Sequence, residues 1–261
     1  MQYILTKKKG AIGHITFNDP DNMNALTPEA MQEIISVLSR YEEDRDIRVV
    51  VFTGSGKAFS AGGNYDFLKR LYNATPVDIK EAVYKNFAGG VKATKMFPKP
   101  TIAAVNGPAV GAGCELAIAC DFRIVSERAL FSEIWARLGV ICPLGGMFLL
   151  PRLVGLSKAT EMLMLGETVD GQEAVQIGLA NQCVPHAQLE DEVRRWTEKI
   201  AAGAPLAMSA MKEGLRRGME STLAREWEYN MFAQATLISS DDCKEGITSA
   251  IDKRAPVFQG N

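Results

Sequence analysis

Apolar and polar residues follow two different periods along the first half of the chain. The segment YILTKKKGAIGHITFND predicts two strands joined by a turn at Lys9 and Gly10. The next segment has apolar residues at helical spacing, and Thr27 and Pro28 suit the N-cap and the first helical position. A further helix with irregular ends is expected within 76–96. Three apolar runs rich in β-branched residues predict strands at 47–54, 99–107 and 121–127.

Glycine-rich segments follow two of these predicted strands, at 54–67 and 107–113. The recurring order of strand, glycine-rich loop and helix predicts a stacked α/β core over residues 1–185. From 186 to 261 the pattern is purely helical, and no β-rich run remains. We expect this helical C-terminal region to pack on the core or on a neighbouring subunit.

The composition of the chain narrows the classes of partner. Of its 261 residues, 47% are hydrophobic and 23% are charged, and the formal net charge is −2. This balance predicts no nucleic-acid or membrane partner, and no run approaches the roughly 20 apolar residues that span a bilayer. The five cysteines form no C-x-x-C pair and the N-terminus does not resemble a secretory signal, so a cytoplasmic location is expected. With only His14 and His186 present, no metal site is expected.

The two glycine-rich segments are candidates for binding an anion. The first does not fit a phosphate-binding P-loop, because Lys57 is followed by Ala58. In one interpretation the glycines only form turns. In the other, each loop presents a backbone N–H to one shared point, and the two amides form an oxyanion hole that holds a carbonyl oxygen as it becomes negative.

Glu115 is an acid within a run of small and apolar residues. If the segment is helical, its neighbours three and four residues away are Gly111, Ala112, Ile118 and Ala119, none of which can pair with a carboxylate. Desolvation should raise the pKa of Glu115, which suits a group that both accepts and donates protons. The alternative is a structural acid that a helix-terminal N–H satisfies.

Several ordered segments resemble the crotonase, or enoyl-CoA hydratase/isomerase, superfamily over nearly the whole chain. They are FNDPDNMNALT, KAFSAGGN, KPTIAAVNGPAVGAGCELAIACD, EAVQIGLANQCVP and DKRAPVFQG. The resemblance implies a spiral of ββα units that forms two stacked sheets flanked by helices, with a helical C-terminal trimerisation region. It also implies a homotrimer, or a hexamer built as a dimer of trimers.

The resemblance implies roles for individual residues. The two oxyanion amides fall on Gly63 and Ala112, and Glu115 matches the first catalytic glutamate of the hydratases. Lys253 matches a C-terminal lysine that reaches a CoA phosphate, often from an adjacent subunit, but the aromatic residue usual three positions earlier is Ala250 here. The implied substrate-binding residues are Asp21, Asn22, Met23, Ala61, Trp135 and Lys253.

The segment ALFSEIWARLG departs from the family pattern. The second catalytic glutamate of hydratases should stand four residues after Phe131, and that position is Trp135. Glu133 could replace it as a catalytic residue if the backbone there is not helical; otherwise a solvated or N-capping glutamate is expected. We expect Trp135 to shape the acyl pocket, with its indole N–H available to water or a substrate carbonyl.

The resemblance implies an enzyme that acts on an acyl-CoA thioester and needs no cofactor, because CoA is part of the substrate. Hydration of a 2-enoyl-CoA to a 3-hydroxyacyl-CoA is the leading hypothesis. The alternatives are one-glutamate chemistry, namely isomerisation, a specialised addition or a carbon–carbon cleavage, and a catalytically inactive homologue. An RNA-binding relative is a further alternative, argued from the clustered lysines Lys80, Lys85, Lys92 and Lys95.

Overall fold

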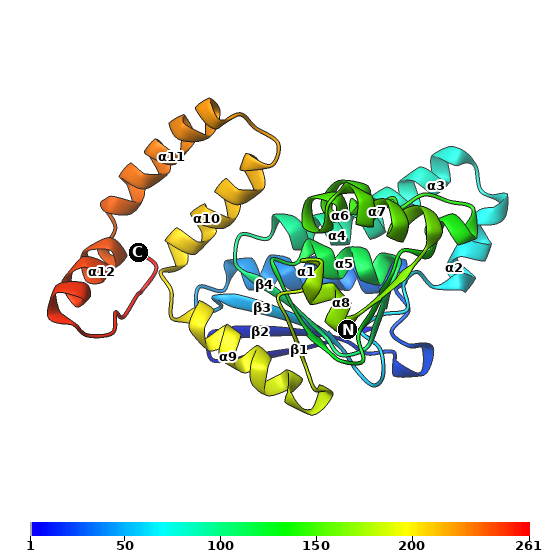
Figure 1. The fold of residues 1–261 in the computed structure, drawn as a ribbon, viewed down its shortest axis with the longest axis horizontal. Helices are drawn as coiled ribbons and strands as arrows, with labels where there is room; N and C mark the ends of the chain where they lie inside the picture. Colours follow the sequence, from blue (N-terminus) through cyan, green and yellow to red (C-terminus); the bar gives the residue numbers. More distant parts are fainter. Residues whose placement is uncertain (1) are drawn as a thin grey trace.

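The computed structural model describes residues 2–261 and contains two β-sheets (Figure 1). The strands are β1 Ile4–Lys9, β2 Ile12–Phe17, β3 Val49–Gly54, β4 Thr101–Val105, β5 Pro108–Val110, β6 Phe122–Ser126, β7 Leu130–Ser132, β8 Thr168–Asp170 and β9 Gln182–Val184. The larger sheet has the order β1-β2-β3-β4-β6-β9, and all of its pairs are parallel except the β1–β2 hairpin. The smaller sheet has the order β5-β7-β8.

Helices connect and cover these strands. The α-helices are α1 Pro28–Glu43, α2 Tyr65–Arg70, α3 Pro76–Ala82, α4 Gly89–Met96, α5 Ala112–Ala119, α6 Gly146–Val154, α7 Leu156–Thr160, α8 Gly171–Gln176, α9 Leu189–Ala201, α10 Pro205–Gly218, α11 Leu223–Ile238 and α12 Asp241–Asp252. Short 3-10 helices are η1 Pro20–Asn22, η2 Leu71–Asn73, η4 Ile134–Leu138 and η6 His186–Gln188. Two segments are π-helical, η3 Val83–Ala88 and η5 Glu161–Leu165.

The first elements follow the predicted pattern. The hairpin turns at Gly10, whose φ of 57° lies in the left-handed region that favours glycine. Helix α1 begins where the capping residues predict, because Thr27 accepts a hydrogen bond from the backbone N–H of Ala30 at 3.2 Å and Pro28 is the first helical residue. The two stacked sheets flanked by helices confirm the predicted fold class.

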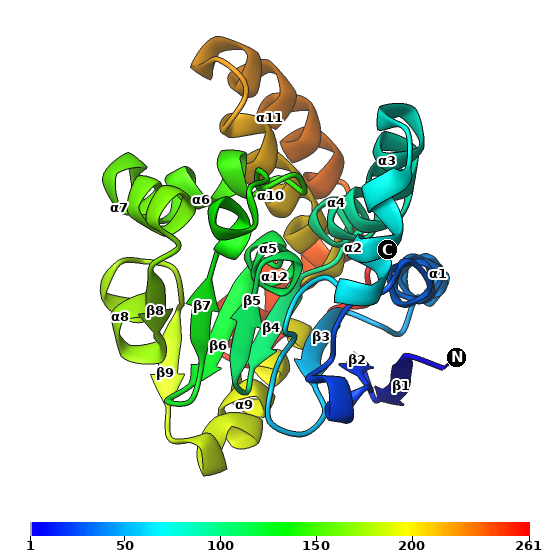
Figure 2. The same cartoon turned by 90° about the vertical axis from the view of Figure 1, so that its right-hand side faces the viewer.

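Helices cover both faces of the larger sheet. Figures 1 and 2 show α1, α4 and α5 on one side of it and α9 on the other. On the α9 side, the ring of Phe122 in β6 packs against Trp196 with centroids 5.4 Å apart. The buried apolar residues that α9 contributes to this face are Leu189, Val193 and Ile200. Helix α5 lies in the core on the opposite side, and each of its residues is buried.

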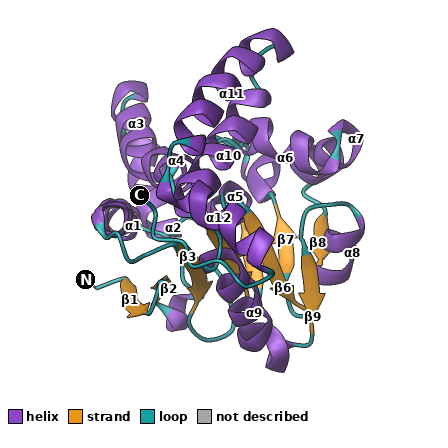
Figure 3. Cartoon of the chain, turned by 90° about the vertical axis from the view of Figure 1, so that its left-hand side faces the viewer, coloured by secondary structure: helices purple, strands orange, loops and turns teal. Residues whose placement is uncertain are grey.

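The C-terminal helices divide into two groups. Although α9 falls within the range 186–261, it packs on the larger sheet and belongs to the core. Helices α10, α11 and α12 extend away from the core, and Figure 3 shows this part as helices joined by loops. Within residues 2–261, no helix combines the length and the apolar character needed to cross a membrane.

The helix expected within 76–96 forms in three pieces. Helix α3 continues into the π-helical segment η3, which leads directly into α4. Thr75 caps α3 by accepting from the backbone N–H of Asp78 at 3.2 Å. A π-helical turn widens the helix by one residue, and such turns often lie at functional sites. Here η3 forms part of the wall of a cavity of about 620 Å³.

Candidate active site

The loop after β3 brings the backbone N–H of Gly63 toward the start of α5. Leu26 donates its N–H to Gly62 O at 2.7 Å and accepts from the N–H of Asn64 at 2.8 Å. In such a parallel bridge the N–H of the middle residue points to the opposite side. The amide of Gly63 therefore points away from Leu26.

The second loop places Ala112 at the first position of α5, where its N–H lies at the positive end of the helix dipole. The preceding Gly111 has φ 50°, and its N–H donates to Ser132 O at 2.8 Å, which fixes the turn into the helix. The two loops approach closely, because a Cβ added to Gly62 would lie 3.5 Å from Ala112 N and 2.5 Å from Val110 O. Gly63 and Ala112 line one cavity of about 50 Å³.

Glu115 lies one turn into α5 and is fully buried. Its Oε1 accepts hydrogen bonds from the backbone N–H of Gly146 at 2.8 Å and of Leu144 at 3.0 Å, and from the thiol of Cys142 at 2.8 Å. Burial raises the pKa of Glu115 to about 7, even though these three donors oppose the shift. Its partners therefore come from the first residue of α6 and the loop before it, and not from its own helix.

Glu133 is also fully buried, so the expectation of a solvated glutamate is wrong. It is the N-cap residue of η4, but its side chain forms no capping bond, and its backbone has φ −104° and ψ 80°, outside the helical region. Its Oε2 accepts the indole N–H of Trp135 at 2.7 Å, and its Oε1 has no hydrogen-bond partner among the described residues. Burial and the charge of Glu115 raise the pKa of Glu133 to about 8.

Cys142 joins the two carboxyl groups. Its Sγ lies 2.8 Å from Glu115 Oε1 and 3.9 Å from Glu133 Oε2. Burial, followed by the two neighbouring carboxylates, raises the pKa of this thiol well above its usual range, so it stays protonated and acts as a donor. Sequence reasoning missed Cys142, since no spacing motif connects it with either glutamate.

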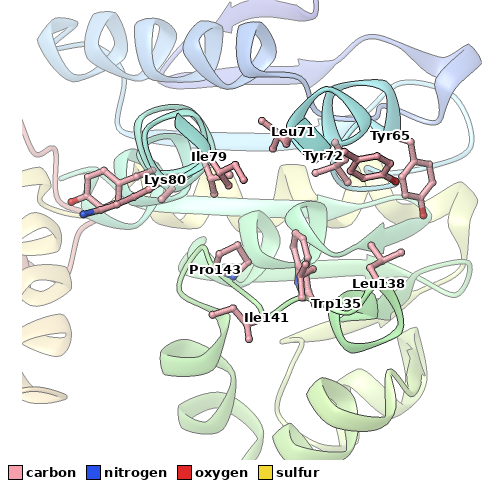
Figure 4. Close-up of a pocket in the computed structure, with 14 residues that line it drawn as sticks. Tyr65, Leu71, Tyr72, Ile79, Lys80, Trp135, Leu138, Ile141 and Pro143 are labelled. Atoms are coloured by element: carbon pink, nitrogen blue, oxygen red, sulfur yellow. The ribbon is translucent and has the colours of Figure 1, made fainter. Parts of the chain in front are cut away.

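Trp135 forms a wall of the site. The residue lines both the 50 Å³ cavity and a larger cavity of about 620 Å³, and its ring lies 3.4 Å from the position of a Cβ on Gly111. Figure 4 shows Trp135 between Pro143 and Leu138 in the larger cavity. Its indole N–H is engaged by Glu133, which corrects the expectation that it is available to water or a substrate carbonyl.

The structure brings only some of the expected CoA-binding residues together. Asp21 and Asn22 form the end of η1, and the next residue, Met23, has φ 51° and accepts the N–H of Ala61 at 2.9 Å. These residues therefore lie beside the loop that carries Gly63. Lys253 directly follows α12, which belongs to the group of helices that extends from the core (Figure 1).

Three of the clustered lysines border two different cavities. Lys80 lines the larger cavity, whereas Lys92 and Lys95 line a separate cavity against α6 and α10. Burial lowers the pKa of Lys95. This arrangement does not favour the RNA-binding alternative. Across residues 2–261, no group of three or more His, Cys, Asp or Glu side chains is placed to hold a metal ion.

Comparisons with known proteins agree with this geometry. The family model described as enoyl-CoA hydratase/isomerase matches residues 7–261. A probable enoyl-CoA hydratase from Rhizobium meliloti (strain 1021) is 37% identical over 98% of this chain and 97% of its own length. An (E)-benzylidenesuccinyl-CoA hydratase from Thauera aromatica is 34% identical over 95% of this chain and 96% of its own length.

A solved structure extends the similarity to the whole fold. The crystal structure of an enoyl-CoA hydratase from Bacillus anthracis superposes with a TM-score of 0.93 at 32% identity, covering 100% of both chains. The family model spans the first oxyanion loop, α5 and the C-terminal helices alike. The chain therefore belongs to the enoyl-CoA hydratase/isomerase family and has the crotonase fold.

Proposed function

We propose that the protein hydrates a 2-enoyl-CoA thioester to a 3-hydroxyacyl-CoA. The observation that supports this most is the pair of buried carboxyl groups beside the cavity that Gly63 and Ala112 line. Leu144 and Trp135 also line that cavity, and they donate hydrogen bonds to Glu115 and Glu133 respectively. The carboxyls thus lie directly behind two residues that line the space where a thioester held by the two amides would place its double bond.

The two carboxyls suit opposite proton states. Two neighbouring buried carboxyls resist ionising together, so near neutral pH the pair holds one proton. Glu115 has three hydrogen-bond donors at its carboxylate oxygens, whereas Glu133 has the higher pKa. We therefore assign the carboxylate to Glu115 and the proton to Glu133.

Hydration then needs only groups of this chain and water. The water oxygen bonds to C3 of the enoyl group, and its proton passes to the Glu115 carboxylate. The π electrons move through C2 to the thioester oxygen, where the amides of Gly63 and Ala112 stabilise the negative charge. C2 then takes the proton of Glu133, the enolate returns to a thioester, and transfer of one proton from Glu115 to Glu133 restores the pair. No cofactor takes part, since CoA enters as part of the substrate.

The proposed CoA site uses Asp21, Asn22, Met23 and Ala61, which lie beside the Gly63 loop. Lys253 follows α12 in the helices that extend from the core, and we propose that it contacts the CoA phosphates of an adjacent subunit. This assignment needs an oligomer in which α12 of one chain reaches the core of another.

The surface of α10–α12 supports a homotrimer, alone or paired as a hexamer. Large apolar side chains on these helices are exposed, among them Trp227 at 63% and Phe232 at 78%. Further examples are Leu215, Leu223, Met231, Ile238, Ile247 and Ile251. Contiguous exposed apolar surface of this kind marks a protein–protein interface. We propose that a second and third copy of this chain cover it.

A reducing compartment such as the cytoplasm is our proposal for the location. All five cysteines, which fall within residues 2–261, are free, and Cys114, Cys120 and Cys142 are buried. Free thiols of this kind persist in reducing compartments. A Dictyostelium discoideum relative, 36% identical over 97% of this chain, is named as a mitochondrial enzyme, so fractionation of cells that express the protein is the direct test.

Loss of the enoyl-thioester absorbance tests the proposed reaction. Wild-type protein should consume 2-enoyl-CoA substrates, and Glu115→Gln and Glu133→Gln should each lower kcat by about 100-fold or more, as expected for loss of a general acid or base. Glu43→Gln, an exposed glutamate at the end of α1, is the matched control and should keep the wild-type rate. If wild-type protein consumes no enoyl-CoA of any chain length, the proposed hydration is wrong. If Glu133→Gln keeps full activity, Glu115 works with a single carboxyl.

A further inference from the structure

An apolar cavity lies between two walls of the chain. Its volume is about 620 Å³. One wall comes from α2, η2, α3 and η3, with Tyr72, Ile79 and Val83, and the other from η4 and the loop after it, with Trp135 and Ile141 (Figure 4). Lys80 is the one charged residue in this lining, and it is exposed. The remaining surface is apolar or aromatic, which favours an uncharged apolar occupant.

This cavity adjoins the 50 Å³ cavity that Gly63 and Ala112 line. The two share four lining residues, Leu68, Val83, Trp135 and Pro143. A thioester oxygen held by Gly63 and Ala112 would therefore leave its acyl chain at the entrance of the larger space. None of the proposed CoA-binding residues at 21–23 and 61 belongs to the lining of that space. The cavity is placed for the acyl group and not for the nucleotide.

The volume sets the size of acyl group that fills it. An apolar cavity of roughly 150 Å³ binds a six-carbon ring such as benzene. A cavity of about 620 Å³ is about four times larger, so the four-carbon crotonyl group would leave most of its apolar wall without contacts. Each further methylene that enters such a pocket improves discrimination by about tenfold or more.

We propose that the acyl group of the natural substrate is large, apolar and uncharged, with about eight or more carbons, as a straight chain or with an aryl ring. This inference rests on the proposed hydration of enoyl-CoA. The inference adds that this site selects against short acyl chains, because the cavity between the wall of α3 and η3 and the wall of Trp135 is too wide for them to fill.

Steady-state kinetics with a substrate series tests the inference. The probes are the CoA thioesters of crotonic, trans-2-octenoic, trans-2-dodecenoic and cinnamic acids, followed by the loss of enoyl-thioester absorbance. We expect kcat/KM for at least one of the three larger substrates to exceed that for crotonyl-CoA by about tenfold or more. A preference for octenoyl or dodecenoyl identifies a chain-binding site, and a preference for cinnamoyl identifies an aryl-binding site; both support the proposal.

A filled cavity provides the second measurement. Ile79→Trp places an indole in the cavity, whereas Val77→Trp, on the same helix at a 65% exposed residue outside the lining, is the matched control. Ile79→Trp should lower the dodecenoyl-to-crotonyl ratio of kcat/KM by about tenfold, and Val77→Trp should leave the ratio unchanged. Thermal unfolding of both variants verifies that they are folded.

The outcomes separate this inference from the proposed function. No turnover of any substrate in the series overturns the hydratase function. Turnover with crotonyl-CoA as the best substrate leaves that function standing and overturns the inference of a large acyl group. An unchanged dodecenoyl-to-crotonyl ratio in folded Ile79→Trp also overturns it, because the chain would then lie elsewhere.

Discussion

The indole N–H of Trp135 donates a hydrogen bond to Oε2 of Glu133 at 2.7 Å. Trp135 occupies the position where the family resemblance places a catalytic glutamate, and it orients the carboxyl of a residue two positions earlier. Because this bond stabilises the ionised carboxylate, it opposes the upward shift in the pKa of Glu133 that burial causes. Trp135 thus stands where the family pattern has a glutamate, and it also lowers the pKa of Glu133, the residue proposed to replace that glutamate.

Trp135→Phe should change the pH dependence of the reaction. Removing the indole N–H removes a group that lowers the pKa of Glu133, so the alkaline limb of the kcat profile should move to higher pH. We expect kcat at neutral pH to fall by about tenfold, because the indole N–H stabilises the carboxylate that forms as Glu133 gives up its proton to C2. Trp196→Phe is the control, because Trp196 donates to Glu192 on α9, away from the site. Superimposable profiles for the wild type and Trp135→Phe would show that Glu133 does not titrate in catalysis.

Cys142→Ala and Cys142→Ser should differ in activity. Alanine removes the donor to Glu115 Oε1, which raises the pKa of Glu115 further and leaves less of it as carboxylate at neutral pH. We expect Cys142→Ala to lose about tenfold in kcat at pH 7 and to recover part of it at higher pH. Serine keeps a donor and should retain more activity, and Cys183→Ala, a half-buried cysteine of β9, is the control. Equal rates for the alanine and serine variants would argue against a role for the donor.

Glu133→Gln should stabilise the fold in a pH-dependent way. The unfolded chain releases the Glu133 proton near pH 4.5, whereas the folded chain holds it until about pH 8. The native state therefore binds more protons in this window, and its free energy of unfolding falls as the pH rises from about 4.5 to about 8. Glutamine removes this cost and still accepts the indole N–H, so Tm of the variant should exceed that of wild type by several degrees at pH 8 and match it at pH 4. A difference that is the same at both pH values would contradict the raised pKa.

Gly146→Ala should disrupt the site, because Gly146 lies directly against the side chains of Glu115 and Cys142. A Cβ on Gly146 would overlap Sγ of Cys142 and lie 2.8 Å from Glu115 Oε1, so the two side chains must move. Displacement of a catalytic group by about 1 Å costs on the order of 100-fold in rate, and we expect kcat to fall accordingly. Gly218→Ala, whose Cβ would have no atom within 4 Å, is the control. Wild-type kcat in Gly146→Ala would show that Glu115 tolerates relocation.

Phe232→Glu should weaken the assembly. The side chain is 78% exposed on α11, and a carboxylate there would be buried without a partner at an interface between copies. Size-exclusion chromatography with light scattering should show a trimer or hexamer for wild type and smaller species for the variant. Leu5→Glu, at a 52% exposed residue of β1, is the control. A monomeric wild-type protein would contradict the proposed trimer.

Most of the fold could be predicted from the sequence, because the capping residues and the β-branched runs favour the same helices and strands that the structure contains. Thr27 and Pro28 set the start of α1, and the β-branched runs form the buried strands of the larger sheet. Patterning does not reveal where one helix packs on another layer. Helix α9 is amphipathic, as α10 and α12 also are, so the amphipathic pattern alone does not place it on the sheet.

The site was predictable where it uses the backbone and one helix. The glycine-rich loops predicted two converging amides, the acid on an apolar helix singled out Glu115, and the family resemblance assigned the amides to Gly63 and Ala112. The structure places these two residues in the lining of one cavity, and Leu144, which also lines it, donates its N–H to Glu115. Whether the side chain of Glu133 is buried or solvated depended on the backbone conformation at that residue, which the composition of the segment does not determine. The position of Cys142 depended on how the segment before α6 folds over α5, a contact 27 residues apart in sequence.

The π-helical segment Val83–Ala88 gives the enzyme a simple route to new specificity. A π-helical turn holds one residue more than the α-helical turn it interrupts, so removing one residue there would rotate α3 by about 100° relative to α4. That rotation would exchange the side chains that Ile79 and its neighbours present to the cavity, without any change in the strands or in α5. A single codon deletion or insertion could thereby give related enzymes different acyl preferences on one catalytic scaffold.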